Sequence, residues 1–405
     1  MVAIFLPGFR NVIGNAEVAV VNGTLLFLCL IYTFHSYRNH NVSGTLSSIV
    51  LLSLFLYFII VSFSSVNGIL YGVQVSLRDI FEFHKPALYI LIFLSVHRIL
   101  QYDVFFSDKI HRILKVTLVI VTIFSVIHIF SSGSILSVYT KDHNIDTKRL
   151  SAPFVNPYDF AFFLSFLASY FLALGVSKSK KYLLPFLLCL LLISLTQSRS
   201  VFFPFVGLIF PFLFFTVFLA NYRRFLRLKV EKHLLSLVFI LTCLAVSVFF
   251  YISANYEQYA YLISGLLNIL ESGSLGSAET RIEQFQLAVR FIKDSPATIL
   301  FGLGPAKSVM EHLESMYSFY LFRYGLFGFF FGFLIPYICS VSALIRKICG
   351  EGIRAEEFPL NASILVFLMM VPFFSIGNNF NEQVRLSFFY MTLIACSVTF
   401  LKPKK

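Results

Sequence analysis

The sequence predicts an all-helical protein that crosses a membrane many times, and three observations support this fold class. Hydrophobic residues make up 58 % of the 405 residues, charged residues only 13 %, and the mean hydropathy is +0.83, whereas a soluble domain carries about 25 % charged residues. Apolar runs of about 20 residues, long enough to cross a bilayer core of about 30 Å, recur along the whole chain. Runs such as VFFPFVGLIFPFLFFTVFLA do not alternate as the strands of a membrane barrel do.

The apolar runs predict eleven membrane-spanning helices within one transmembrane domain, residues 1–405. Residues 1–14 either add a half-span, which brings the number to about twelve, or lie in the membrane interface. The predicted spans lie near residues 17–34, 45–66, 82–101, 113–131, 158–176, 182–198, 201–220, 234–253, 316–345, 359–376 and 387–401.

The basic residues predict how these helices are oriented. The net charge is +12, and more than half of the 32 lysines and arginines fall in the loops of one side, which also holds the C-terminus. Loops rich in Lys and Arg remain cytoplasmic. We therefore expect a cytoplasmic C-terminus, and the basic excess is an orientation signal that gives no reason to expect a nucleic-acid partner.

The longest loop of the opposite side, residues 254–315, is predicted to form an ordered external subdomain. Within it, TRIEQFQLAVRFIKDSP predicts a helix that begins with a capping box of Thr280 and Glu283. Its expected apolar face consists of Ile282, Phe285, Val289 and Ile292. Arg281 then occupies the first turn, where a cation opposes the helix dipole unless an anion binds there. The alternative is an arginine that faces solvent.

Arg199 follows a span directly, in the stretch SLTQSRSVFF, and lies on the same outer side. Its neighbours in this short connection are polar: Thr196, Gln197, Ser198 and Ser200. An arginine near membrane depth usually faces a polar cavity or a partner, and the alternative is an arginine that extends to lipid headgroups. The cluster of hydroxyl and amide groups favours the cavity.

Glu314 lies at the outer end of the ninth predicted span, with Glu311, Ser315 and Ser318 beside it at helical spacing. A carboxylate next to an apolar membrane segment costs free energy, so it usually has an ion-pair partner or a functional role. Further along, the GFFFG pattern predicts close approach of a neighbouring helix, and the glycines of this span are Gly325, Gly328 and Gly332. Glu314 is either a general base or the ion-pair partner of Arg281 or Arg323, and the sequence favours neither role.

Four segments, in this order and topology, resemble the O-antigen ligase and O-antigen polymerase superfamily of bacterial inner-membrane glycosyltransferases. RDIFEFHKPALY (78–89) is similar to a motif found early in the polymerases, and RLSAPFVNPYDFAFFL (149–164) to a segment with Arg, then Asn-Pro, before a span. LTQSR (195–199) resembles the superfamily's arginine motif, and ETRIEQF with the following DSP and FGLGP resembles the start of its large periplasmic loop. The resemblance implies a class C glycosyltransferase-like fold.

The segment around Glu314 favours a polymerase over a ligase. Ligases carry His, a small polar residue and, about nine positions later, Gly followed after two residues by another small residue. Glu314, Ser315, Gly325 and Gly328 fit this frame with Glu in place of His. An acid followed by Ser is more typical of polymerases.

The resemblance implies transfer of one undecaprenyl-diphosphate-linked oligosaccharide onto another at the periplasmic face of the inner membrane, with release of undecaprenyl diphosphate. The product is O-antigen or a related surface polysaccharide, and a separate co-polymerase is expected to regulate chain length. No cofactor is expected, and no metal, because the histidines and outer aspartates do not have metal-type spacing.

Site roles follow from this chemistry. Glu314 is expected to act as the base, while Arg199 and Arg281 hold the diphosphate. Arg323 either tunes Glu314, contacts lipid phosphate or is structural. Further candidates for binding substrate are Arg78, Arg149, Glu311 and Arg385. Two other functions remain open: an O-antigen ligase that transfers glycan to the lipid A core, and a flippase for the lipid-linked oligosaccharide.

Overall fold

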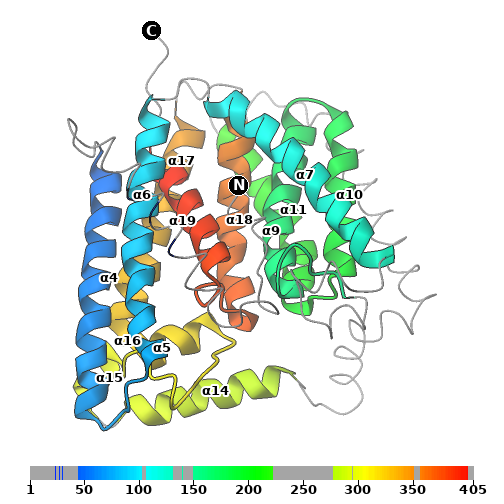
Figure 1. The fold of residues 1–405 in the computed structure, drawn as a ribbon. Helices are drawn as coiled ribbons and strands as arrows, with labels where there is room; N and C mark the ends of the chain where they lie inside the picture. The colour runs from blue at the N-terminus through cyan, green and yellow to red at the C-terminus, as the bar shows by residue number, and fades with distance from the viewer. Residues whose placement is uncertain are drawn as a thin grey trace.

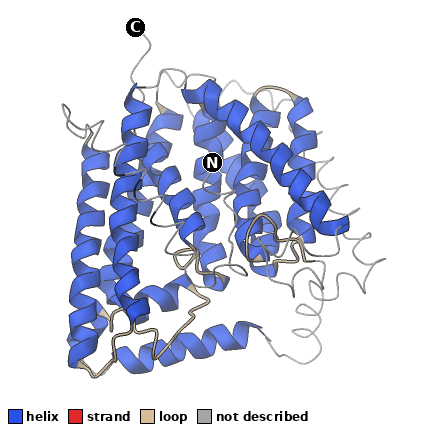
Figure 2. Cartoon of the chain, in the orientation of Figure 1, coloured by secondary structure: helices blue, strands red, loops and turns tan. Residues whose placement is uncertain are grey.

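The computed structural model describes residues 44–102, 106–130, 149–221, 277–293, 295–350 and 356–399, together with isolated positions at 23, 27, 30 and 139. Within these ranges every regular element is a helix (Figure 2), which confirms the predicted all-α class. Apart from the isolated positions 23, 27 and 30, the predicted span near 17–34 lies outside the described residues. The same is true of the predicted span near 234–253, residues 1–14 and the first part of the 254–315 loop.

Six described helical segments are long and apolar enough to cross a membrane, so a multi-pass membrane protein is supported. They lie in α4 (Thr45–Leu70), α7 (Phe106–Phe130), α9 (Pro157–Ser177), α11 (Arg199–Asn221), the continuous segment Met316–Cys349 and α18 (Phe358–Gly377). Shorter or more polar helices are α6 (His84–Tyr102), α10 (Leu183–Leu195) and α19 (Val384–Val398). Each predicted span within the described ranges overlaps one of these elements.

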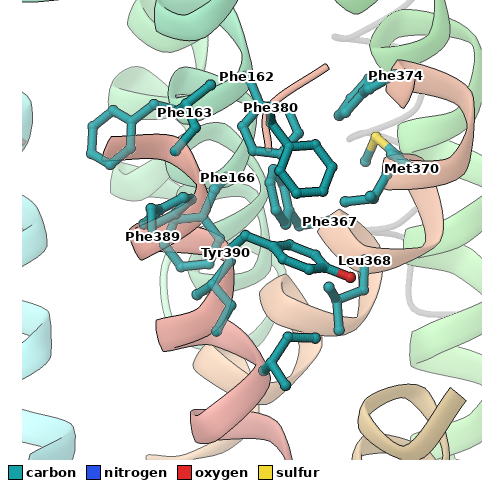
Figure 3. Packing of buried hydrophobic residues seen from close by; sticks show 14 of the residues in the cluster. Phe162, Phe163, Phe166, Phe367, Leu368, Met370, Phe374, Phe380, Phe389 and Tyr390 are labelled. Atoms are coloured by element: carbon teal, nitrogen blue, oxygen red, sulfur yellow. The ribbon is translucent and has the colours of Figure 1, made fainter. Parts of the chain in front are cut away.

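The helices form a bundle in which α9 is central, because 83 % of its apolar window is buried (Figure 1). It packs on α10 and α18, while α19 packs on α6 and α7 crosses diagonally over the outside. Aromatic rings fill the centre (Figure 3). Phe162 of α9 lies 4.9 Å from Phe367 of α18, and Phe166 lies 5.2 Å from Phe389 of α19, measured between ring centroids. Edge-to-face pairs of this kind add about 0.5–1.5 kcal/mol each beyond the area they bury.

Short helices cover one end of this bundle (Figure 1). They are α5 (Leu77–Ile80), η2 (Phe81–Phe83), α14 (Ser277–Ile292) and α15 (Pro296–Phe301). The opposite end holds the turn between α9 and α10, with η4 (Lys180–Tyr182). The two ends therefore differ in construction.

The ninth predicted span is not one regular helix. It consists of α16 (Met316–Phe329), the π-helical segment η6 (Phe330–Leu334) and α17 (Ile335–Cys349), and α16 contains a break at Gly325, whose φ is 63°. The break leaves backbone carbonyls without helical donors, and the turn after α15 supplies these. The N–H of Leu303 donates to Phe322 at 3.0 Å, and that of Gly304 donates to Arg323 at 2.8 Å. The predicted span near 316–345 is present as the segment Met316–Cys349, and its helix is broken at Gly325.

The close approach predicted for the glycines is confirmed at Gly325 and Gly332, with a different partner at each. A Cβ at Gly325 would collide with the backbone of Leu300, so this glycine admits the turn after α15. A Cβ at Gly332 would lie 2.8 Å from the ring of Tyr57, so this glycine admits α4. Together these contacts hold α16 and η6 against α15 and α4.

Candidate functional site

The C-terminal end of α18 contacts both the start of α11 and the side chain of Arg281. The hydroxyl of Ser200 accepts a hydrogen bond of 2.7 Å from the side-chain amide of Asn378. A Cβ at Gly377 would lie 2.6 Å from the Cβ of Ser200 and 3.5 Å from the guanidinium carbon of Arg281. Glycine at position 377 therefore leaves the space in which Arg281 approaches Ser200, the residue that follows Arg199.

Arg281 also forms an ion pair with Glu314, with 3.1 Å between Nε and Oε2. The Arg281 side chain is 24 % exposed and that of Glu314 is 47 % exposed, so both groups are accessible from the outside of the bundle. The Nε of Arg281 has no well-oriented hydrogen-bond acceptor among the described residues. The pair is thus electrostatic and half-exposed, which makes it weak enough to be separated by a competing anion.

Glu314 is held by its backbone and not by its carboxylate alone. Its N–H donates to the side-chain oxygen of Gln284 at 3.0 Å, and the Gln284 amide donates to the carbonyl of His312 at 3.4 Å. From the other side, the amide of Asn379 donates to the carbonyl of Leu313 at 3.2 Å. The segment before α16 is therefore fixed between α14 and the loop after α18, while the carboxylate of Glu314 stays accessible.

Two details predicted for α14 are wrong. The helix begins at Ser277, so Thr280 is not its cap and Arg281 lies in the second turn, beyond the free N–H groups of the helix start. The anion site expected from those N–H groups is thereby removed, and Arg281 contributes through its side chain alone.

The second error concerns which face of α14 packs inward. Three residues of the expected apolar face are exposed: Ile282 (45 %), Phe285 (44 %) and Val289 (38 %). Arg281, Gln284 and the buried Ala288 instead face the bundle. Polar side chains occupy this inner face because they bind the segment that carries Glu314.

Arg199 is the first residue of α11 and is half-buried. Its polar neighbours in the preceding connection, Thr196, Gln197 and Ser198, are all buried. The N–H of Leu150 donates to the carbonyl of Leu195 at 3.1 Å, which places the neighbouring Arg149 at this same connection. Two of the motif segments singled out in the sequence therefore lie together.

Arg385, the second residue of α19, donates from Nη1 to the carbonyl of Pro153 at 3.3 Å. The segment that begins with Arg149 thus contacts both the connection before α11 and the start of α19. Glu311 is exposed, with its side chain 55 % accessible. Arg78 is in α5, and its side chain is outside the described part of the structure.

A second group of charges lies buried beneath the segment that carries Glu314. Glu82 of η2 pairs with Lys85 at 2.7 Å and with Lys307 at 2.5 Å. Asp79 accepts the backbone N–H of Lys307 at 3.0 Å. Because Glu82 and Lys85 are buried, these pairs attach the turn after α15 firmly to the start of α6.

Arg323 belongs to this buried group and has no exposed surface. Its Nη2 lies 2.9 Å from a carboxylate oxygen of Glu382 and also donates to the carbonyls of Met310 and Glu311, at 3.4 and 3.1 Å. Direct contact of Arg323 with a lipid phosphate is therefore a wrong expectation for this structure. The residue positions the 310–314 segment from below.

Paired cations hold the buried Glu82 and the partly buried Glu382 in the ionised form. Burial by itself raises the pKa of Glu82, but the charges of Lys85 and Arg323 outweigh it and hold that pKa well below its ordinary value. Burial likewise opposes ionisation of Glu382, and its contacts with His312 and Arg323 lower its pKa. The interaction with Glu382 in turn raises the pKa of His312. The group is therefore ionic over the ordinary pH range.

Sequence reasoning missed several residues that build this site. Gln284, Lys307 and Glu382 were not identified as site residues. Gly377 was also missed, because it lies directly after a predicted span. The available signal was the polar run GNNFNEQVR (377–385) between two apolar spans. A long polar stretch in so short a connection indicates side chains with partners inside the protein.

Among the described residues, no group of three or more His, Cys, Asp or Glu side chains is placed to hold a metal ion. At this end of the bundle Arg281 and Glu314 form an accessible pair of opposite charges. Compared with known protein families and with characterised proteins, the sequence matches none.

Proposed function

We propose that this protein is a bacterial inner-membrane glycosyltransferase that polymerises undecaprenyl-diphosphate-linked oligosaccharide repeat units at the periplasmic face of the membrane. The observation that carries the proposal is the accessible pair of Arg281 and Glu314, placed against Ser200 at the start of α11, next to Arg199. A cation and a potential base adjoin each other at one end of a helical membrane bundle. The motif resemblance supplies the substrate class.

The reaction needs these two kinds of group. A hydroxyl oxygen of the acceptor sugar bonds to the anomeric carbon of the donor glycan, and the bond from that carbon to the diphosphate oxygen breaks. Glu314 takes the hydroxyl proton as general base. The leaving undecaprenyl diphosphate takes the electron pair, and the guanidinium groups of Arg281 and Arg199 stabilise its growing negative charge.

The ion pair implies an exchange when the donor binds. Glu314 and the donor diphosphate compete for the guanidinium of Arg281, so donor binding frees the carboxylate for the acceptor hydroxyl. The Arg281 side chain is pre-positioned by Gly377, and Glu314 by Gln284. Both groups therefore need only small side-chain movements.

The surrounding candidates take roles that match their places. We assign Arg149 and Arg385, which lie near the start of α11, to donor or acceptor binding. The exposed Glu311 of the 310–314 segment is assigned the same role. Arg323 supports this segment through Glu382. A chain-length co-polymerase is the protein partner we propose, and the chemistry we assign requires no metal or cofactor.

The activity is tested with purified protein, lipid-linked repeat units and electrophoresis of the products. Arg281→Ala and Arg199→Ala should leave single repeat units on the carrier, and the lysine variants should restore little, because a point charge does not reproduce bidentate geometry. Arg290→Ala is the matched control, since Arg290 is an exposed arginine of the same helix. Full-length polymer from Arg281→Ala would remove that residue from the reaction.

The exchange is tested by binding of undecaprenyl diphosphate in detergent. Glu314→Gln should abolish polymerisation but tighten this binding by about 2- to 5-fold, because an exposed ion pair contributes about 0.5–1 kcal/mol. Glu283→Gln, an exposed acid on α14, should change neither quantity.

In the Arg281→Ala background the Glu314→Gln effect on binding should vanish, because the residue at position 314 then has no Arg281 guanidinium for which to compete with the diphosphate. Weaker binding by Glu314→Gln alone would refute the exchange and leave the polymerase proposal standing. Transfer of glycan only to the lipid A core would instead assign the protein as a ligase.

A further inference from the structure

The end of the bundle opposite Glu314 carries a dense group of exposed basic residues from two segments. One is the first part of α7 and the other is the turn between α9 and α10 with η4. The exposed bases are Lys109, Arg112, Lys115, Lys178, Lys180 and Lys181. Residues 109–115 and 178–182 contain no acidic residue, and Asp108 of α7 directly precedes the first of these segments.

These two segments are joined at Tyr182. The Nζ of Lys115 lies 5.5 Å from the centre of its ring, and that of Lys181 lies 5.4 Å from the same centre. His111 contacts the Tyr182 hydroxyl at 3.4 Å and the Tyr170 hydroxyl at 2.9 Å, which fixes the ring against α9. Two ammonium groups from separate segments are therefore held beside one aromatic ring.

A continuous apolar stripe leads away from this basic group along α7. Lys109 and Arg112 begin a stripe with spacings of three and four residues that continues through Val116, Val119 and Ile123 to the other end of the helix. Its apolar members are well exposed: Val116 (57 %), Val119 (59 %), Ile123 (53 %), Val126 (48 %) and Phe130 (84 %). One face of α7 thus begins with cations and continues with exposed branched and aromatic side chains.

The position of Lys115 sets the depth of this group. The candidate membrane span of α7 runs from Lys109 to Phe130, so Lys115 lies about 9 Å from its first residue along the helix axis, at 1.5 Å per residue. A lysine at this depth extends its ammonium group to the headgroup layer while its methylenes stay among the acyl chains. The Tyr182 ring lies beside Lys115, and tyrosine is enriched at membrane–water interfaces.

We infer that α7, with Lys115 and Lys181 beside Tyr182, is a binding site for an anionic diacyl phospholipid. The two lysines contact the headgroup phosphate, and the stripe from Val116 onward contacts the acyl chains. The combination of fixed cations and an adjoining apolar face selects a whole anionic lipid over a free phosphate ion. The site is separate from the Arg281–Glu314 pair and does not depend on the proposed reaction.

The experiment measures lipids retained by the full chain in native mass spectrometry after incubation with phosphatidylglycerol or phosphatidylethanolamine. The unchanged protein should retain phosphatidylglycerol preferentially. The double variant Lys115→Gln/Lys181→Gln should weaken this retention by roughly 30-fold, since each basic residue near an anionic lipid contributes about 1 kcal/mol. Tyr182→Phe keeps the ring and should retain the lipid, whereas Tyr182→Leu should lose part of it.

The charge-matched control is Arg346→Gln/Arg290→Gln, which removes two exposed cations elsewhere. An equal loss in this control would show general attraction to positive charge and overturn the inference, and so would equal retention of the two lipids. Glycerophosphoglycerol, the headgroup without chains, and inorganic phosphate should not displace the lipid. Displacement by either would reduce the site to a surface phosphate contact and contradict the role given to the α7 stripe.

Discussion

Arg323→Met would remove the charge of a fully buried side chain while keeping much of its volume. In the native structure Nη2 of Arg323 lies 2.9 Å from Glu382 and donates to two backbone carbonyls, while the guanidinium carbon lies 4.9 Å from the centre of the Phe319 ring. The substitution leaves Glu382, whose side chain is only 19 % exposed, without its closest cation. The substitution therefore leaves the carboxylate of Glu382 uncompensated beneath the proposed site.

The size of the effect follows from these contacts. Breaking a buried pair by removing one partner destabilises a protein by about 3–5 kcal/mol. Two features favour the lower end. Water reaches part of Glu382, and the Nε and Nη1 atoms of Arg323 have no hydrogen-bond partner among the described residues, so the native guanidinium itself carries a desolvation penalty. We expect a loss of about 3–4 kcal/mol.

The assay is equilibrium unfolding of the purified protein in mixed micelles, with Arg323→Met compared with Arg323→Met/Glu382→Gln. The second substitution removes the uncompensated charge and should restore about 1–2 kcal/mol. A further loss of stability in the double variant would refute the reasoning, because the carboxylate would then be shown to stabilise the protein without Arg323.

Two further predictions concern the backbone of α16 and the pH dependence of stability. Gly325→Ala should destabilise the protein by more than about 1–2 kcal/mol, because φ is 63° and the added Cβ meets the backbone of Leu300. The control is Gly207→Ala, where nothing lies within 4 Å of the added Cβ, and it should be neutral or stabilising. Equal melting temperatures for the two variants would contradict this account. The raised pKa of His312 means that its contribution is complete below a pH of about 6.5 and is lost as pH rises through the folded-state pKa. The melting temperature should therefore fall slightly more from pH 6 to pH 8 in the unchanged protein than in His312→Gln, and parallel curves would exclude this role.

The places where sequence reasoning failed have physical causes. The capping box of Thr280 is a valid local signal, but the preceding Ser-Ala-Glu also favours a helix, so α14 starts at Ser277. Periodicity correctly found the apolar residues of α14. Periodicity did not identify the inner face of the helix, because that face is set by tertiary contacts. Arg281 and Gln284 turn toward the bundle since they form an ion pair and a hydrogen bond with Glu314.

The sequence by itself determined the all-helical membrane class and the places of the described spans, because hydrophobicity is a property of each residue and needs no knowledge of its neighbours in space. It also singled out Arg281 and Glu314 as reactive candidates. Only the tertiary structure decided that these two pair, that Arg323 is buried against Glu382, and that the turn after α15 fills the break at Gly325. Such choices depend on distances between segments far apart in the chain, which packing alone determines.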